Sequence, residues 1–87
     1  MKTYLFFSHV PMDFEGVCYL NNEQAEFWFI PNRVVHRIDG PAISCDDKSI
    51  GPPYLFFING EPYSEKDYWQ HPLVVKNTLN EILNGKV

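Results

Sequence analysis

Basic residues are scarce in this 87-residue chain. Seven Lys and Arg stand against eleven Asp and Glu, which gives a formal net charge of −4. Proteins that bind DNA or RNA present a run or stripe of basic side chains to the phosphates, and no such run is present. We therefore expect no direct contact with nucleic acid. An acidic face is suited instead to a basic face on another protein.

Cysteines and long apolar runs are also few. Small secreted domains stapled by disulfides usually carry more than the two cysteines found here, Cys18 and Cys45. The apolar run of residues 4–7 near the start is too short for a signal peptide, because Ser8 and His9 interrupt it and no cleavage site follows. No apolar stretch reaches the length of a transmembrane helix. These absences predict a reduced, cytoplasmic protein that does not enter membranes, with both cysteines acting as small buried hydrophobes.

Motifs for catalysis, metal binding and phosphate binding are missing as well. No nucleophile motif surrounds the Ser or Cys residues, and no glycine-rich phosphate loop is present. Zinc needs about four ligands. The available ligands have no paired spacing and are His9, His36, His71, Cys18 and Cys45. We expect no enzymatic activity, no metal and no cofactor.

What the chain does contain is a series of short segments rich in β-forming residues, followed by a change of periodicity. Asn59-Gly60, after the last of these segments, is a strong signal for a tight β-hairpin. The predicted strands are Lys2–Ser8, Gly16–Leu20, Ala25–Ile30, Arg33–His36, Pro41–Cys45 and Tyr54–Ile58. They predict an antiparallel sheet of about five or six strands within residues 1–63.

The last quarter of the chain, residues 64–87, predicts one or two helices. Ser64 is a candidate N-cap for a short helix from Glu65 to Gln70, and Pro72 suits the first turn of a second helix. Gly85 is placed for a C-terminal cap. One face of the second helix is apolar through Val75, Leu79, Ile82 and Leu83. The fold class is therefore predicted as α+β: a single domain in which the C-terminal helices cover a face of a twisted sheet.

The string HRIDGPA, residues 36–42, has two interpretations. In the structural one, Asp39-Gly40 makes a tight turn and Pro41 starts the next strand, while His36 and Arg37 bond to Asp39 or to turn carbonyls. In the catalytic one, His36 is a general base oriented by Asp39. The structural interpretation is favoured, because no nucleophile motif accompanies the histidine. Whether His36 and Arg37 contact only the turn or also a ligand is left open.

Parts of the chain repeat. Residues 12–18 resemble residues 36–42 in pattern, 24 positions later. Residues 29–36 resemble residues 56–63 at an offset of 27, whereas Tyr-Leu-Phe-Phe at 4–7 recurs at 54–57, 50 positions later. The first two offsets do not add up to the third, so at least one alignment is wrong by one residue. A unit of strand, turn and strand cannot bury its own apolar face, and stacking such units solves this problem.

HRIDGPA resembles the core of short repeats of the form W-Y-x-N-G-x-x-H-R-x-D-G-P-A, which occur in proteins of bacteriophages, large DNA viruses and some bacteria. The resemblance covers residues 27–69. The chain departs from the pattern in having Phe29 and Phe56 where Trp is usual, and Asn32-Arg33 in place of Asn-Gly. The resemblance implies stacked β-hairpins and a phage or prophage setting. It implies no particular reaction, since the family has no settled shared activity.

The function predicted from these features is protein binding. The chain is expected to be a small phage or prophage accessory protein that inhibits or redirects a host protein, such as a defence component, in the host cytoplasm. The candidate contact residues are acidic or aromatic: Asp46, Asp47, Glu61, Glu65, Asp67, Tyr68 and Trp69. The two aromatic residues have an equally plausible role in docking the helix onto the sheet. The residues assigned to architecture are His36, Arg37, Asp39, Gly40, Pro41, Asn59 and Gly60.

A second hypothesis is a protein that binds or sequesters a small, nucleotide-like ligand. A pocket of sufficient size would then form between two copies of so short a chain. A homodimer is reasonable under either hypothesis, because the sheet has uncovered edges and the chain has more aromatic rings than a small core hides easily.

Overall fold

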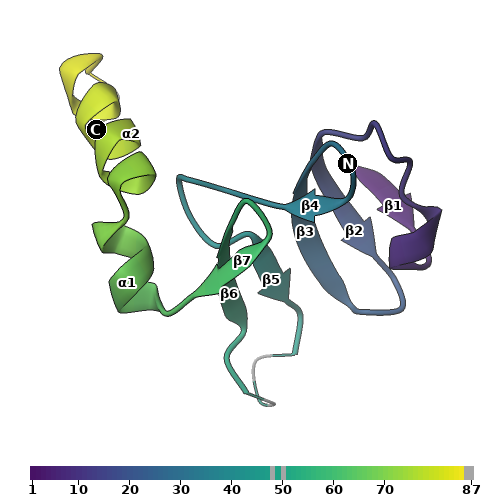
Figure 1. Cartoon of the computed structure of the whole chain (residues 1–87). Helices are drawn as coiled ribbons and strands as arrows, with labels where there is room; N and C mark the ends of the chain where they lie inside the picture. Colours follow the sequence, from purple (N-terminus) through teal and green to yellow (C-terminus); the bar gives the residue numbers. More distant parts are fainter. Residues whose placement is uncertain (48, 50, 86–87) are drawn as a thin grey trace.

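The computed structural model describes residues 1–47, 49 and 51–85 and confirms the α+β class (Figure 1). The described part contains a seven-stranded sheet followed by two helices. The strands are β1 (Lys2–Tyr4), β2 (Gly16–Leu20), β3 (Ala25–Ile30), β4 (Val34–Val35), β5 (Ile43–Cys45), β6 (Tyr54–Ile58) and β7 (Glu61–Tyr63). The helices are a short 3-10 helix η1 (Phe7–His9), α1 (Glu65–Gln70) and α2 (Pro72–Leu83).

The sheet is mixed, so the prediction of a purely antiparallel sheet is wrong at one edge. Its order is β1-β2-β3-β5-β6-β7, with β4 paired to β3, and β1 alone runs parallel to its neighbour β2. A parallel pair needs a long crossover, and residues 5–15 supply one. The predicted first strand was also too long, because the strand ends at Tyr4 and the chain turns into η1 at Phe7.

The two β-hairpins differ by one residue in the length of their turns. In the β6–β7 hairpin, Ile58 pairs with Glu61 across the two-residue turn Asn59-Gly60, whose φ angles are 52° and 82°. The β3–β4 hairpin has three residues, 31–33, between its paired ends. Its left-handed residues are Asn32 and Arg33, at φ 73° and 55°. The left-handed pairs align at the offset of 27, whereas Ile30 and Ile58, the paired residues before the turns, align at 28, so the hairpins do not reconcile these offsets with the offset of 50.

Two separate cores stabilise the molecule. The first lies where residues 4–14 cover β2 and β3, and it includes Cys18, whose thiol pKa is raised by burial. Its buried members are Val10, Cys18, Leu20 and Phe29. The second lies where the helices meet β6, and its buried members are Phe56, Ile58, Tyr68 and Val74. Cys45 is half-buried, and both cysteines are free thiols.

The helix boundaries match the sequence signals. The Ser64 hydroxyl accepts a hydrogen bond from the Asp67 N–H at 3.1 Å, as an N-cap does. His71 separates the helices and caps the second one, since its Nδ1 accepts the Leu73 N–H at 3.1 Å. Pro72 occupies the first turn of α2, and the Gly85 N–H is bonded to the Ile82 carbonyl at the other end.

The orientation of α2 differs from the prediction. The helix contacts the rest of the protein through Val74, which is fully buried, whereas the apolar face through Val75, Leu79, Ile82 and Leu83 is exposed. In Figure 1 the helix extends away from the sheet instead of lying across it. The expectation that this face covers the sheet is therefore wrong, because the chain direction at His71 turns the Val74 side inward. None of the helices in the described part of the chain is long and apolar enough to cross a membrane.

Candidate protein-binding surface

The polar residues of HRIDGPA are held by one another. The Arg37 guanidinium lies 4.0 Å above the centre of the Trp28 ring, which is a favourable cation–π distance. Its Nε donates to the Asp39 carboxylate at 2.6 Å, and its Nη1 donates to the Pro41 carbonyl at 3.1 Å. Arg37 thus closes the Asp39–Pro41 turn against the sheet, and the Asp39 carboxylate is paired with Arg37 and not with His36.

Gly40 is required by this arrangement. The residue is buried and has a φ of +159°. A β-carbon placed there would lie 3.0 Å from the Arg37 Cζ and 3.2 Å from Nη2. The glycine therefore allows the guanidinium to pack directly on the backbone.

Tyr68 ties helix α1 to the same turn. Its hydroxyl oxygen lies 2.6 Å from the Arg37 carbonyl oxygen and 2.7 Å from the Gly40 carbonyl oxygen. The hydroxyl donates to the Gly40 carbonyl and accepts the Gly40 N–H at 3.2 Å. The side chain is completely buried, and this burial raises the pKa of the phenol. The expectation that Tyr68 contacts a partner is thus corrected, because it docks the helix and has no exposed surface to offer.

His36 caps the second hairpin. Its Nδ1 accepts the Asn59 N–H at 2.9 Å, at the tight turn Asn59-Gly60. A ring nitrogen accepts only when it carries no proton, so this contact selects the neutral imidazole, and burial lowers the pKa of His36 further. The residues assigned to architecture therefore meet in one network that joins the two hairpins and α1.

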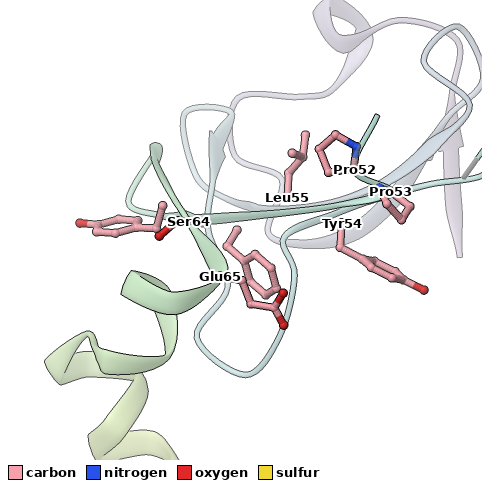
Figure 2. Close-up of a pocket in the computed structure, with 8 residues that line it drawn as sticks. Pro52, Pro53, Tyr54, Leu55, Ser64 and Glu65 are labelled. Atoms are coloured by element: carbon pink, nitrogen blue, oxygen red, sulfur yellow. The ribbon is translucent and has the colours of Figure 1, made fainter. Parts of the chain in front are cut away.

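A groove opens beside this network, between the strand β6 and the start of α1. We call it the β6–α1 groove; its volume is about 320 Å³. It is lined by Pro52, Pro53, Tyr54, Leu55, Phe56, Tyr63, Ser64 and Glu65. Figure 2 shows Tyr54 and Leu55 leaving the strand on opposite sides, with the Glu65 carboxylate on the Tyr54 side.

One of the predicted contact residues lines this groove, and three others lie on the flanking elements β7 and α1. Glu65 lines it, Glu61 is exposed on the neighbouring edge strand β7, and Asp67 is exposed in the first turn of α1. Trp69 is 45% exposed and packs edge-on against Phe56, with 6.1 Å between the ring centres. Glu65 thus places one carboxylate at the groove, and Glu61 and Asp67 lie within four positions of it in the sequence, with the exposed Lys66 between Glu65 and Asp67.

The other two predicted acidic contacts are engaged elsewhere. The Asp46 carboxylate accepts a short hydrogen bond from the Tyr19 hydroxyl, which raises the pKa of Tyr19. Asp47 accepts the Ser49 N–H at 2.9 Å and the Ser49 hydroxyl at 2.6 Å, and these bonds lower the pKa of Asp47. Asp46 and Asp47 are exposed, are bonded within the protein and do not line the groove.

Most of the apolar lining of the groove was not anticipated from the sequence. In the sequence, strand and turn positions are the expected roles of Pro52, Pro53 and the partly exposed Leu55. The available signal was the string Pro-Pro-Tyr-Leu-Phe, which puts two rigid residues directly before an aromatic strand. A proline pair next to exposed aromatic residues is a reason to expect a surface that binds another molecule.

A second hollow, of about 280 Å³, lies over the HRIDGPA turn. Its lining includes Glu15, Gly16, Trp28 and Asp39. Among the described residues, no three His, Cys, Asp or Glu are grouped so as to hold a metal ion.

Comparisons of the chain with protein-family models, curated proteins and solved structures found no significant match. The resemblance of HRIDGPA to viral hairpin repeats therefore stays a prediction from the sequence.

Proposed function

We propose that this protein is a binding module that holds a basic segment of another protein in the β6–α1 groove. The observation that carries the proposal is the combination of an open apolar groove with the Glu65 carboxylate in its lining. Pro52, Pro53 and Phe56 line the groove together with Glu65. A segment with one apolar side chain beside a Lys or Arg matches both features.

The residue types support a protein partner. Interfaces between proteins are enriched in Tyr and Trp, which bring a large contact area at low entropic cost. Tyr54 and Trp69 are each 45% exposed beside the groove. The prolines limit the backbone freedom that binding would otherwise remove. The carboxylates of Glu61, Glu65 and Asp67 would accelerate the encounter with a basic partner.

The resemblance to viral hairpin repeats extends this proposal. We infer a phage or prophage accessory protein that inhibits or redirects a host protein, such as a defence component. The stacked-repeat architecture is part of the same proposal. It is supported by the left-handed pairs Asn32-Arg33 and Asn59-Gly60 and by the positive φ angles of Gly16 and Gly40 at matching positions.

The test is a pull-down of proteins from bacterial lysate by the tagged full chain, with charge-matched variants. The double variant Glu61→Lys, Glu65→Lys reverses the charge of Glu65 in the groove and of Glu61 on the neighbouring strand β7, and Asp13→Lys, Glu23→Lys reverses two exposed charges elsewhere. We expect a specific protein to be captured by the wild type and by the Asp13/Glu23 variant, and to be lost from the groove variant.

The outcomes separate the hypotheses. Equal loss in both variants would show that net charge, and not the groove, governs capture. Retention by the groove variant would contradict the groove as the binding site. If no protein is captured and a small molecule accompanies the purified chain, the ligand-binding hypothesis replaces this one.

A further inference from the structure

The exposed apolar side of α2 is a feature that the groove does not explain. We call the residues Val75, Leu79, Ile82 and Leu83 the α2 stripe. Their side chains are between 41% and 83% exposed. Aliphatic residues at spacings of three and four lie together on one side of a helix, so these four form a continuous surface.

The stripe faces away from the molecule because the other side of α2 is the one that docks. Val74 is fully buried, and Asn77 and Glu81 are half-buried. The Thr78 hydroxyl is bonded to the Val74 carbonyl at 3.0 Å. The helix thus turns its more polar side toward the protein and its aliphatic side outward, which is the reverse of an ordinary surface helix. Such an arrangement indicates that another surface covers the stripe.

We propose that a second copy of this chain covers it, through an antiparallel pairing of the two α2 helices. The spacing of the stripe is the first reason. Val75 and Leu83 lie four positions on either side of Leu79. A two-fold axis beside Leu79 therefore places Leu79 of one copy against Leu79 of the other. The same axis places Val75 of each copy against Leu83 of the other copy. This self-matching is what an interface of two-fold symmetry requires.

Charge is the second reason. Glu81, the acidic residue of α2, is half-buried with Asn77 on the side of the helix away from the stripe. Lys76 flanks the stripe in the first half of the helix. A cation is favourable beside a helix C-terminus. In the antiparallel pair, Lys76 lies next to the last turn of the partner helix, where this condition is met.

The same features argue against the groove's partner as the occupant. The β6–α1 groove offers carboxylates to a basic segment, whereas the stripe offers none. The two surfaces are thus chemically different, and the dimer proposal does not depend on the proposed function.

Sedimentation velocity of the full chain over a range of concentrations tests the dimer. We expect a reversible monomer–dimer equilibrium that Leu79→Lys shifts by at least about tenfold toward monomer, since burying a charge in an apolar contact is strongly unfavourable. Leu73→Lys is the matched control, because Leu73 is 43% exposed on the same helix but lies off the stripe. This variant should dimerise as the wild type does.

Disulfide trapping tests the antiparallel arrangement. In a Cys45→Ser background, Leu79→Cys should form a covalent dimer on oxidation, and Leu73→Cys should not. Lys76→Glu should weaken association in the antiparallel pair. A wild type that is monomeric at millimolar concentration overturns the proposal, as does equal behaviour of the Leu79 and Leu73 variants. A monomer whose Leu79→Lys variant no longer captures a protein partner would assign the stripe to that partner instead.

Discussion

At the scale of single residues, HRIDGPA is a set of contacts in which the side chains of His36, Arg37 and Asp39 each bond to a partner inside the protein. Arg37 bonds to Asp39 and Pro41, His36 bonds to the Asn59 N–H, and the Tyr68 hydroxyl bonds to the backbone of Arg37 and Gly40. The motif joins three parts of the chain that are distant in sequence. Its composition resembles that of an active site because buried turns need charged and polar groups to satisfy their backbones.

The hydroxyl of Tyr68 should matter more than its ring. Tyr68→Phe keeps the ring but leaves the buried polar groups of Arg37 and Gly40 without this partner, so we expect a loss of about 2 kcal/mol in unfolding free energy. For a domain of this size the melting temperature should fall by about 10 °C. Tyr63→Phe, at a half-buried ring that packs on His71, is the control and should change little. Equal effects in thermal melts of the two variants would contradict the role of the hydroxyl.

Gly40 is predicted to tolerate no side chain. Gly40→Val should cost about 2–4 kcal/mol, because the positive φ is strained for other residues and the β-carbon meets the Arg37 guanidinium. Gly16→Val is the control, since Gly16 also has a positive φ but its added β-carbon has nothing within 4 Å. Urea titrations should show the larger loss for Gly40. Equal losses would mean that strain acts alone and that packing on Arg37 contributes nothing.

The His36 contact predicts a pH dependence. The pKa of His36 is lowered in the folded protein relative to 6.5, through burial. The unfolded chain therefore binds the proton more readily, and stability is lost as the pH falls below about 6.5. Thermal melts between pH 8 and pH 5 should show this decline, and His36→Gln should flatten it. A variant with the same decline as the wild type would contradict the assignment to His36.

At the scale of helices and strands, short sequence signals predict a feature correctly where that feature depends only on neighbouring residues. Ser64, Pro72 and Asn59-Gly60 each determine a cap, a first turn or a hairpin through their own geometry, and all three are found as expected. The parallel pairing of β1 was not predictable in this way, because it depends on how residues 5–15 cross the sheet. The direction of α2 depends likewise on the packing of Val74 and not on the stripe.

The N-cap of α1 gives the test at this scale. Ser64→Ala should destabilise the protein by about 1 kcal/mol, because the Asp67 N–H loses its acceptor. Ser64→Asp keeps an acceptor at the same position and should restore most of the stability. Chemical denaturation of the three proteins checks this. If alanine and aspartate behave alike, the cap does not support the helix.

At the scale of the whole molecule, the chain has two small cores and two unlike exposed surfaces. A domain of this length buries a modest fraction of its surface, and the second core depends on α1 for Tyr68 and on α2 for Val74. The acidic residues near the groove could be named from the sequence, because the charge of a side chain follows from its residue type. The groove itself could not be, because Pro52 and Glu65 meet only after β7 and α1 have folded against β6.

The central claim is that the β6–α1 groove holds a segment of another protein. The most direct measurement is photo-crosslinking in living bacteria, with a benzophenone amino acid at Tyr54, which lines the groove on the Glu65 side, or at Glu23, an exposed control position. We predict a specific adduct of this chain with a different protein from position 54 and none from position 23. The absence of an adduct at position 54, or the same adduct from both positions, would contradict the claim.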